Sequence, residues 1–552
     1  MFDINEYTAL EKRMRFFNTA GPVNHVDHYC LPPLGRLNLE DILSMIDQKK
    51  YFVLHAPRQT GKTTCLKALM DYLNGEGTYR ALYINVESAQ GARENVPDGM
   101  AAIYHEYAGN VEYYLGDKSW RLDDVEVRRR YGREVVAGAF SAWAVANDLP
   151  TVLLLDEIDS LIGDMLISTL RQLRAGYNKR SDNFPQSVIL CGVRDVRDYR
   201  IHSDLEKTII TGGSAFNIKA KSLRLGDFNQ REVTTLLNEH TIETGQEFDA
   251  QAQSLIWEFT LGQPWLVNAL AYEVCFEMKK GRDRKLPITR EMVITARENL
   301  IGRRETHLDQ LVDKLGEERV RSVIEPVLSG KAMMQPAKPD DIEYVKDLGL
   351  IHIARNGELT VANPIYKEII PRELSWNVQT AIAQKVSWYV LPNGKLNMEK
   401  LLSAFQEFFR ENSEHWIERF QYKEAGPQLL LQAFLQRIIN SGGRIEREYA
   451  LGRMRTDLLI FWPSGAHTAD KPAADNGRTN LQKIVIELKI LHKNLEKTIA
   501  DGLSQTFEYM ARCNADEGHL VIFDRDKQKS WDEKIFMRDA KFNEEKILIW
   551  GA

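Results

Sequence analysis

Residues 51–64, YFVLHAPRQTGKTT, decide the fold of the N-terminal part of the chain. The apolar run 51–55 predicts a buried strand, and apolar residues at helical spacing after Thr63 predict a helix. A loop rich in backbone N–H groups, placed between such a strand and the positive N-terminus of a helix, can hold phosphate groups. The stretch therefore predicts a nucleoside triphosphate site on an α/β fold.

The loop supplies the predicted nucleotide contacts. Lys62 would reach the β and γ phosphates, and the Thr63 hydroxyl would bind Mg²⁺. The first motif position is Ala56 instead of glycine, which is tolerated where the backbone needs no positive φ. The alternative interpretation is that the sequence G-K-T precedes a helix by chance and does not bind phosphate. The residues assigned to nucleotide binding here are Ala56, Pro57, Arg58, Gln59, Thr60, Gly61, Lys62, Thr63 and Thr64.

A second motif completes this site. The apolar run 151–155 predicts another buried strand, which ends in Asp156 and Glu157. Asp156 would hold Mg²⁺ through water, and Glu157 would polarise the attacking water. The alternative interpretation of this motif is a strand followed by a solvated acidic turn without a role in nucleotide binding. A further strand, 187–193, leads to three candidates for contact with the γ-phosphate, any of which could equally be part of a charged turn: Arg194, Arg197 and Arg200.

Residues 20–375 resemble the AAA-like branch of the STAND and archaeal-type ATPases. The matching stretches are HYCLPPLGR at 28–36, APRQTGKTT at 56–64, LLLDEID at 153–159 and GQPWLV at 262–267. The resemblance implies that Pro264 lies on a lid near the nucleotide, that Arg194 is a sensor-1 arginine, and that residues 28–34 surround the adenine. It also implies a winged helix after the lid.

The wing is supported by the sequence itself. A predicted helix near residue 342 leads to two short β-runs joined by Asn356-Gly357, a strong hairpin signal. Winged helices can bind DNA, but this wing carries only Arg355 as a cation, so its phosphate affinity should be weak. We favour a nucleotide-responsive lever over a DNA-binding wing.

The C-terminal part changes character. Asp457 opens the strand LLIFW, and Glu487 and Lys489 lie two residues apart on IVIELKI, so their side chains point to one face of a sheet. Charged groups on a buried strand are costly unless they pair or bind metal. Asp457 and Glu487 would hold Mg²⁺ or Mn²⁺ that activates a water, and Lys489 would orient that water or neutralise charge. A surface strand with an ordinary Glu–Lys pair is the alternative.

The spacing D-x(29)-E-L-K resembles the PD-(D/E)XK nuclease superfamily over residues 420–552. The resemblance implies that Gln505, on the following helix, is a further catalytic residue, and more weakly that Glu424 supplies an acid. Thr456 stands where a proline is usual, which removes no chemistry. An upstream arginine cluster could line a phosphate groove or, because Glu446 and Glu448 interrupt it, form a mixed solvated face. It consists of Arg444, Arg447, Arg453 and Arg455.

Bulk properties set the limits. The chain has 552 residues, of which 43% are hydrophobic and 27% charged, and this length predicts several hydrophobic cores. Its net charge of −6 argues against a protein that coats nucleic acid non-specifically. Five scattered cysteines without a C-x-x-C pair fit a reducing cytosol. The N-terminus lacks a secretory signal pattern, and no apolar stretch reaches the roughly 18 residues that span a bilayer. We expect a cytoplasmic protein.

We therefore predict an α/β P-loop NTPase with a parallel sheet, helical lid and winged helix, followed by an α/β restriction-endonuclease-like domain. The predicted boundaries are 1–230 for the ATPase domain, 231–305 for the lid, 306–375 for the winged helix, 376–420 for a helical connector and 421–552 for the nuclease domain. The expected ligands are ATP with Mg²⁺, Mg²⁺ or Mn²⁺ at the nuclease site, nucleic acid (DNA before RNA), and further copies of the chain.

The predicted function is an ATPase that regulates a metal-dependent endonuclease, by architectural analogy in prokaryotic defence against phage or mobile elements. Three alternatives stay open. They are a signalling ATPase whose C-terminal domain binds nucleic acid or a partner without cleavage, a nuclease with a static nucleotide-bound scaffold, and a repair or recombination motor.

Overall fold

The computed structural model describes residues 14–93, 95–195, 200–203, 208–303, 314–329, 338–354, 357–374, 389–419, 430–432, 434–435, 444–451, 454–463, 481–491, 494–524, 526, 528–543 and 545–552. The chain divides into two compact units. The first comprises Met1–His307 and Lys338–Ile365, and the second comprises Leu308–Ala337 and Tyr366–Ala552. No helix in the described ranges has both the length and the apolar character needed to cross a membrane.

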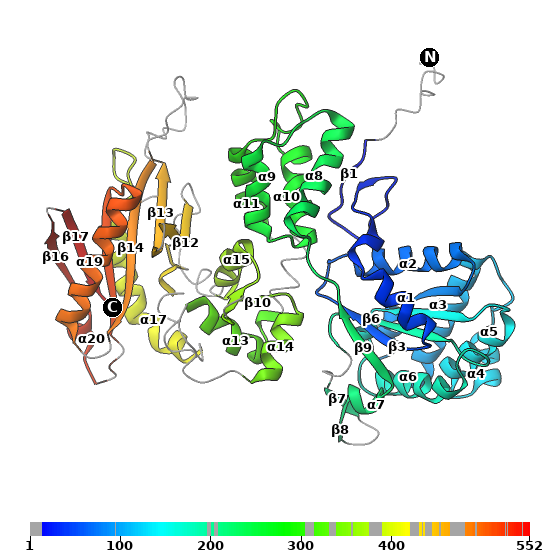
Figure 1. Cartoon of the computed structure of the whole chain (residues 1–552). Coiled ribbons are helices and arrows are strands. Elements are labelled where there is room, and N and C mark those ends of the chain that lie inside the picture. Colours follow the sequence, from blue (N-terminus) through cyan, green and yellow to red (C-terminus); the bar gives the residue numbers. More distant parts are fainter. Residues whose placement is uncertain are drawn as a thin grey trace, which may run out of the picture. The chain divides into compact units, whose positions relative to one another are not determined.

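The first unit is built on a sheet of five parallel strands in the order β4-β5-β6-β3-β9. Figure 1 labels three of them, β3, β6 and β9. This confirms the predicted parallel sheet of a P-loop fold. Parallel strands end at the same edge, so the loop after β3 and the acids after β5 meet there. The strands are β3 (Tyr51–His55), β4 (Arg80–Asn85), β5 (Thr151–Asp156), β6 (Ser187–Gly192) and β9 (Lys219–Arg224).

Helices cover both faces of this sheet. Side chains alternate along each strand, so Tyr51 and Val53 join one apolar cluster while Phe52 and Leu54 join the other. Burial on both faces explains why the strands read as continuous apolar runs. One face carries α1 (Leu39–Asp47) and α2 (Lys62–Glu76), and the other carries α3 (Val96–Leu115), α5 (Val135–Ala146) and α6 (Gly163–Gly176).

Smaller elements complete the sheet domain. The strands β1 and β2 pair in parallel near the N-terminus, and β7 and β8 form an antiparallel hairpin. Their bounds, with those of two short helices, are β1 (Phe16–Phe17), β2 (His28–Tyr29), α4 (Asp124–Tyr131), β7 (Arg200–Ser203), β8 (Thr208–Thr211) and α7 (Gly212–Ala215).

A group of helices follows in the range where a lid is predicted. Local signals fix their starts: Asn229 forms a capping box with Glu232, and the Asp249 carboxylate caps the next helix. Gly262 has φ +80°, and a Cβ there would lie 1.8 Å from the Phe228 carbonyl oxygen, so only glycine fits before the third helix. The helices are α8 (Gln230–Thr244), α9 (Ala250–Thr260), α10 (Pro264–Tyr272) and α11 (Arg290–Arg303).

The first unit also contains a helix and a hairpin from beyond the lid. The hairpin pairs Ile351 with Val361, and Gly357 turns with φ +83°, while Asn356 of the predicted turn lies outside the described residues. The division of the chain places α13 in the second unit and α14 in the first. The elements in the first unit are α14 (Pro339–Asp347), β10 (Ile351–Ile353) and β11 (Leu359–Val361). The second unit contains α13 (Glu318–Ser329) and all but the first two residues of α15 (Pro364–Leu374).

The second unit is built on a mixed sheet in the order β12-β13-β14-β15-β17-β16. The strands β12, β13 and β14 form an antiparallel meander, and β15 returns parallel to β14 after a helical crossover. The strands are β12 (Arg444–Leu451), β13 (Met454–Pro463), β14 (Leu481–Leu491), β15 (Glu517–Asp524), β16 (Phe536–Phe542) and β17 (Glu545–Gly551).

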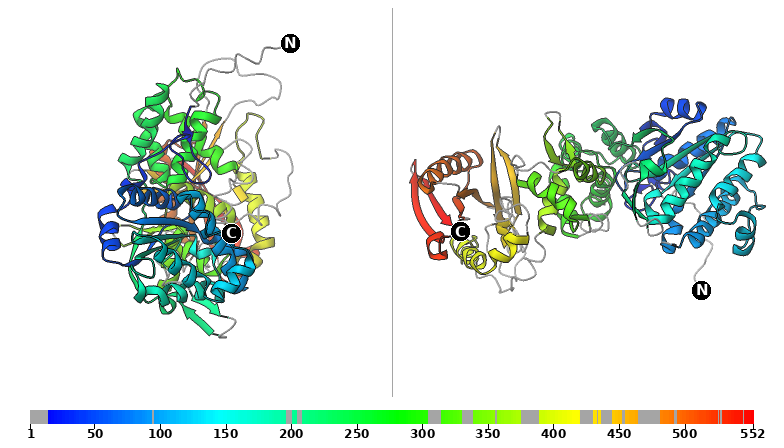
Figure 2. Two further views of the ribbon diagram at one scale, coloured as in Figure 1. Left: turned by 90° about the vertical axis from the view of Figure 1, so that its right-hand side faces the viewer. Right: turned by 90° about the horizontal axis from the view of Figure 1, so that it is seen from below.

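Helices flank this sheet as well (Figure 2). The crossover helix α19 (Leu495–Cys513) packs on one face, and α17 (Met398–Arg419) packs on the other together with Leu430–Leu435, of which 433 is not described. A short helix, α20 (Trp531–Lys534), precedes β16. Residues 420–429, 436–443 and 464–480 lie outside the described residues.

Candidate functional site

The phosphate loop leaves β3 in the geometry that its sequence requires. The Ala56 N–H donates to the Gly192 carbonyl at 3.2 Å, which ties the start of the loop to β6. Ala56 is not among the residues with positive φ, so alanine fits its position. Gln59 and Gly61 do adopt positive φ, +59° and +90°, and α2 begins directly afterwards at Lys62. The loop is thus closed by a glycine and by one strained glutamine.

Two residues of the loop connect it to its surroundings. The Lys62 ammonium donates to the carbonyls of Ala56 and Pro57, each at 3.1 Å, so the lysine lies over the loop. The Thr63 hydroxyl donates to Asp156 Oδ2 at 2.6 Å, which joins the loop to the acidic end of β5. Tyr83, at 3.0 Å, donates to the same oxygen from β4, a contact that the sequence did not reveal.

Glu157 has an unusual environment. Its φ is +57°, and burial raises the pKa of its carboxyl to about 7, with the nearby Asp159 carboxylate acting in the same direction and Lys62 against it. Asp159 in turn accepts a hydrogen bond from the Val193 N–H at 2.9 Å. This bond holds the turn that carries Glu157 against the end of β6.

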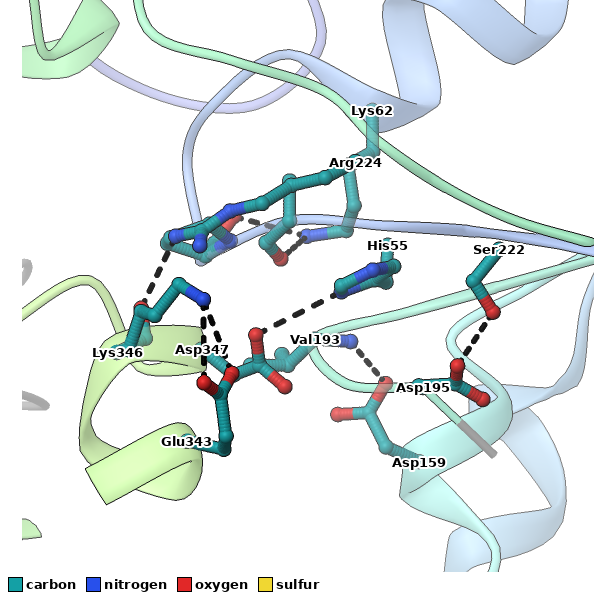
Figure 3. A network of polar contacts seen from close by, with 12 residues as sticks. His55, Lys62, Asp159, Val193, Asp195, Ser222, Arg224, Glu343, Lys346 and Asp347 are labelled. Atoms are coloured by element: carbon teal, nitrogen blue, oxygen red, sulfur yellow. Dashed lines mark hydrogen bonds and ion pairs between the residues drawn. The ribbon is translucent and has the colours of Figure 1, made fainter. Parts of the chain in front are cut away.

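Helix α14 lies over the same edge of the sheet. Figure 3 shows His55, the last residue of β3, facing Asp347 of α14 with 3.7 Å between Nδ1 and Oδ1. Arg224, the last residue of β9, donates to the Lys346 carbonyl at 3.0 Å (Figure 3). The Arg194 guanidinium stacks on the ring of Tyr344, 4.8 Å from its centre.

The chain after α14 also approaches the phosphate loop. Gly349 has φ +78°, and a Cβ on it would meet the Pro57 side chain at 2.8 Å. Arg194 itself contacts α14 through Tyr344, and its predicted contact with the γ-phosphate stays a prediction. Arg197 lies outside the described residues, and of Arg200 only its backbone in β7 is described.

A cleft opens beside the loop. Arg36 joins its walls: its guanidinium donates to the Thr60 carbonyl at 2.5 Å and the Gly226 carbonyl at 2.8 Å, and it stacks on Phe228. The lining comes from the N-terminal segment, the loop and the lid, and includes Asn18, Thr19, Ala20, Gly21, Val23, Tyr29, Cys30, Leu31, Pro33, Gln59, Thr60, Gly61, Thr64, Cys65, Leu236, Pro264, Trp265 and Asn268.

The comparisons with known proteins agree with this site. Residues 46–199, which run from the end of α1 past β6, match a family described as an AAA domain. Residues 46–199 are an AAA-type P-loop ATPase domain. The predicted ATP binding and ATPase character are confirmed at this level. No curated protein is significantly similar to the chain.

Several solved structures are similar in fold to the part of the chain that contains the ATPase domain. A Walker-type ATPase of Pyrococcus abyssi is 13% identical, with 64% of this chain and 99% of that one covered and a TM-score of 0.45. The ORC2 protein of Aeropyrum pernix is 15% identical, with 62% and 93% covered and a TM-score of 0.37. Cdc6p of Pyrobaculum aerophilum is 16% identical, with 62% and 93% covered and a TM-score of 0.32.

A second cluster of candidate residues lies far from the ATPase domain in sequence. The strands β13 and β14 are neighbours, and the pairing of Leu458 with Ile486 places Asp457 and Glu487 side by side. Asp457 Oδ2 accepts a hydrogen bond from the Leu488 N–H at 2.8 Å, and the Lys489 ammonium donates to Glu487 Oε1 at 2.6 Å. The predicted triad is thus gathered on two adjacent strands.

This cluster contains two carboxylates, Asp457 and Glu487, and one ammonium group, Lys489. Burial and, after it, the Asp457 carboxylate raise the pKa of Glu487 to about 7, and Lys489 acts against both. Glu487 Oε2 and Gln505 Oε1 are buried without a hydrogen-bond partner in the described part of the chain. A buried carboxylate oxygen without a donor favours a cation or a donor from outside the chain.

Tyr509 is a further residue of this cluster that the sequence did not single out. It lies one helical turn after Gln505 on α19, a spacing that could have indicated it. Burial raises the pKa of its hydroxyl to about 12, and the charges of Glu487 and Asp457 act in the same direction. Its ring therefore lies within the field of both carboxylates.

Other predicted residues of this region cannot be placed. Glu424 and Arg453 lie outside the described residues, and only the backbones of Arg444, Arg447 and Arg455 are described, in β12 and β13. Within the described residues no three His, Cys, Asp or Glu side chains gather in the manner of a metal site. Asp457 and Glu487 are two carboxylates, so a cation there would take its remaining ligands from Gln505, backbone carbonyls, water or substrate.

Proposed function

We propose that this protein is an ATPase that controls a metal-dependent nuclease. ATP with Mg²⁺ is bound and hydrolysed at the loop Ala56–Thr64, and nucleic acid, DNA before RNA, is cut at Asp457, Glu487 and Lys489. The observation that carries the nuclease is the buried Glu487 carboxylate, which shares its site with a second carboxylate and a lysine and has one oxygen without a partner.

In the ATPase site each residue has a task that its contacts support. Lys62 is already 3.1 Å from two loop carbonyls and has only to swing outward to meet the phosphates. The Thr63 hydroxyl and Asp156 Oδ2 are 2.6 Å apart. A magnesium ion would interact with both groups and replace the hydrogen bond between them. Glu157, half-buried directly after β5, orients the attacking water.

In the proposed nuclease site the charge of each residue determines its role. Asp457 and Glu487 would hold a divalent ion, which lowers the pKa of a bound water and stabilises negative charge on the scissile phosphate. Lys489, held by Glu487, keeps its ammonium at the same place for the attacking water or the phosphate. Gln505 Oε1 is an unused acceptor that can hold a water in line.

Coupling between ATP and the rest of the chain would begin at α14. Arg194, the predicted contact of the γ-phosphate, stacks on Tyr344, and Gly349 passes against Pro57 of the loop. Because a triphosphate would compete with Tyr344 for the Arg194 guanidinium, its arrival shifts α14 and the hairpin behind it. This supports the lever over the DNA-binding wing.

A cleavage assay separates this proposal from its rivals. Wild-type protein with Mg²⁺ or Mn²⁺ should cut DNA, whereas Asp457→Ala and Lys489→Ala should not. Lys546→Ala is a matched control, because Lys546 forms an exposed pair with Asp539 at 3.2 Å elsewhere on the same sheet. Equal cutting by all four proteins would refute the assigned site. ATP-dependent retention of DNA without any cutting would support the binding-only signalling ATPase instead.

The biological role that the architecture predicts is defence against phage or mobile elements. Expression of the wild-type protein in a bacterial host should then lower the number of phage plaques, and Asp457→Ala should restore it. Plaque numbers that are the same for the wild type and for a host without the protein, over a panel of phages, would count against this role. ATP-driven movement along DNA without cutting would favour the motor.

A further inference from the structure

We propose that Asn268 selects adenine, by accepting a hydrogen bond from the exocyclic amine of the base on its amide oxygen Oδ1. The proposal rests on ATP binding by the AAA domain and adds the residue that recognises the base. Asn268 lies on α10, one turn after Pro264, and lines the cleft beside the phosphate loop. Its side chain is 9% exposed.

The direction of the amide is fixed by its own helix. Asn268 Nδ2 donates to the Pro264 carbonyl at 2.8 Å. A carbonyl oxygen can only accept, so the nitrogen of the amide must face Pro264 and the oxygen must face away from it. The side chain therefore presents an acceptor and not a donor.

That acceptor has no hydrogen-bond partner among the described residues. Oδ1 is buried and receives no hydrogen bond from the described residues. Donors elsewhere in the cleft wall are engaged: Trp265 Nε1 donates to the Thr19 carbonyl at 2.8 Å, and Arg36 holds the Thr60 and Gly226 carbonyls. A buried acceptor without a donor is unfavourable, and a ligand that supplies the donor removes that cost.

The chemistry of the purines decides which base fits. The rest of the wall offers apolar surface for a flat ring, from Leu31, Pro33 and Leu236 among others. Adenine carries an amine at its sixth position, which donates to Oδ1. Guanine and hypoxanthine carry a carbonyl oxygen there, which would face Oδ1 acceptor to acceptor. The cleft therefore favours ATP over GTP and inosine triphosphate.

A competition experiment tests this inference without relying on hydrolysis. A fluorescent ADP analogue bound to the full chain is displaced with ATP, with inosine triphosphate or with tripolyphosphate. Wild-type protein should bind ATP about tenfold more tightly than inosine triphosphate, or more. In Asn268→Leu, which keeps the branched shape of the side chain, and in Asn268→Ala, the affinity for ATP should fall to that for inosine triphosphate while tripolyphosphate binds as before.

Asn147→Leu is the matched control. Asn147 Nδ2 makes the same kind of bond, to the Trp143 carbonyl four residues earlier at 2.7 Å, but Asn147 does not line the cleft. This variant should keep the preference for ATP. Equal affinity of the wild type for ATP and inosine triphosphate, or a preserved preference in both Asn268 variants, would overturn the inference. Absence of all nucleotide binding by the wild type would instead refute the ATP site itself.

Discussion

Two residues of the ATPase site adopt a backbone conformation that side chains other than glycine rarely take. Gln59 and Glu157 have φ of +59° and +57°, and both lie at the carboxyl edge of the parallel sheet. Such a conformation costs on the order of 1–3 kcal/mol, so the surrounding contacts must hold it. For Glu157 these include the bond from its own N–H to Asp156 Oδ1 at 3.0 Å. Strain and proposed chemistry therefore coincide.

Glu157→Gln tests the role of this residue. Glutamine keeps the size of the side chain but cannot take a proton from water, so ATP hydrolysis should fall by about 10²- to 10⁴-fold. ATP affinity should stay the same, because Lys62 and the loop are unchanged. Phosphate release measures the first quantity and equilibrium binding the second. A variant that hydrolyses ATP at the wild-type rate would exclude Glu157 as the group that activates water.

At the scale of elements, the docking of α14 on the phosphate loop depends on Gly349. Gly349→Ala should weaken ATP binding and lower the melting temperature, because alanine disfavours φ +78° and its Cβ would press on Pro57. Gly357→Ala is the control, since Gly357 has a similar φ, +83°, but nothing within 4 Å of an added Cβ. It shares the backbone strain and lacks the contact.

The two glycine variants must therefore differ. Binding of ATP and thermal unfolding, measured side by side, should show a larger effect for Gly349→Ala than for Gly357→Ala. Equal effects would mean that backbone strain alone is at work, and the contact between α14 and the loop would lose its proposed part in coupling.

His240 links the N-terminal strands to the lid and makes stability depend on pH. Its ring contacts the Tyr29 hydroxyl at 3.2 Å and Gln246 Oε1 at 2.9 Å, and burial lowers the pKa of its imidazole. Because the unfolded chain then binds the proton more readily, the stabilisation is present above pH of about 6.5 and is lost as the pH falls below it.

Thermal unfolding at pH 7.5 and 5.5 measures this effect. His240→Gln should show a smaller loss of melting temperature on acidification than the wild type does, while His25→Gln, which changes an exposed histidine of the same N-terminal segment, should behave as the wild type. A wild-type loss that persists in full in His240→Gln would assign the pH dependence to other groups.

The elements that the sequence predicted are those with a local signal. The strands β3, β5 and β6 are buried on both faces and read as unbroken apolar runs, and the loop between β3 and α2 carries its own motif. On β14, the two-residue spacing of Glu487 and Lys489 correctly placed both side chains on one face.

Contacts between distant segments had no such signal. The stacking of Arg194 on Tyr344 joins residues 150 positions apart in the sequence. Nothing in the sequence around either residue indicates this contact. The same holds for Arg36 and the Gly226 carbonyl, and for the bond from the Leu488 N–H to Asp457. Asn268 carries no sequence signal either, because only the structure shows that its Oδ1 is buried and lacks a hydrogen-bond partner among the described residues.

At the scale of the whole molecule, each unit has the core of an independent domain. Apolar clusters cover both faces of the parallel sheet in the first unit and both faces of the mixed sheet in the second. Each unit can therefore hold its own fold by itself, and the proposed function requires ATP bound to the first unit to act on the second through domain geometry or assembly. The proposal thus needs ATP to alter cleavage, and not merely to bind.

The rate of DNA cleavage with and without ATP tests this most directly. Wild-type protein with Mg²⁺ or Mn²⁺ should cut DNA at rates that differ between ATP, ADP and no nucleotide. Lys62→Ala, which lacks the lysine for the phosphates, should cut at one rate under all three conditions. Cleavage by the wild type at a single rate, whatever nucleotide is present, would contradict the account and leave the ATPase domain as a scaffold.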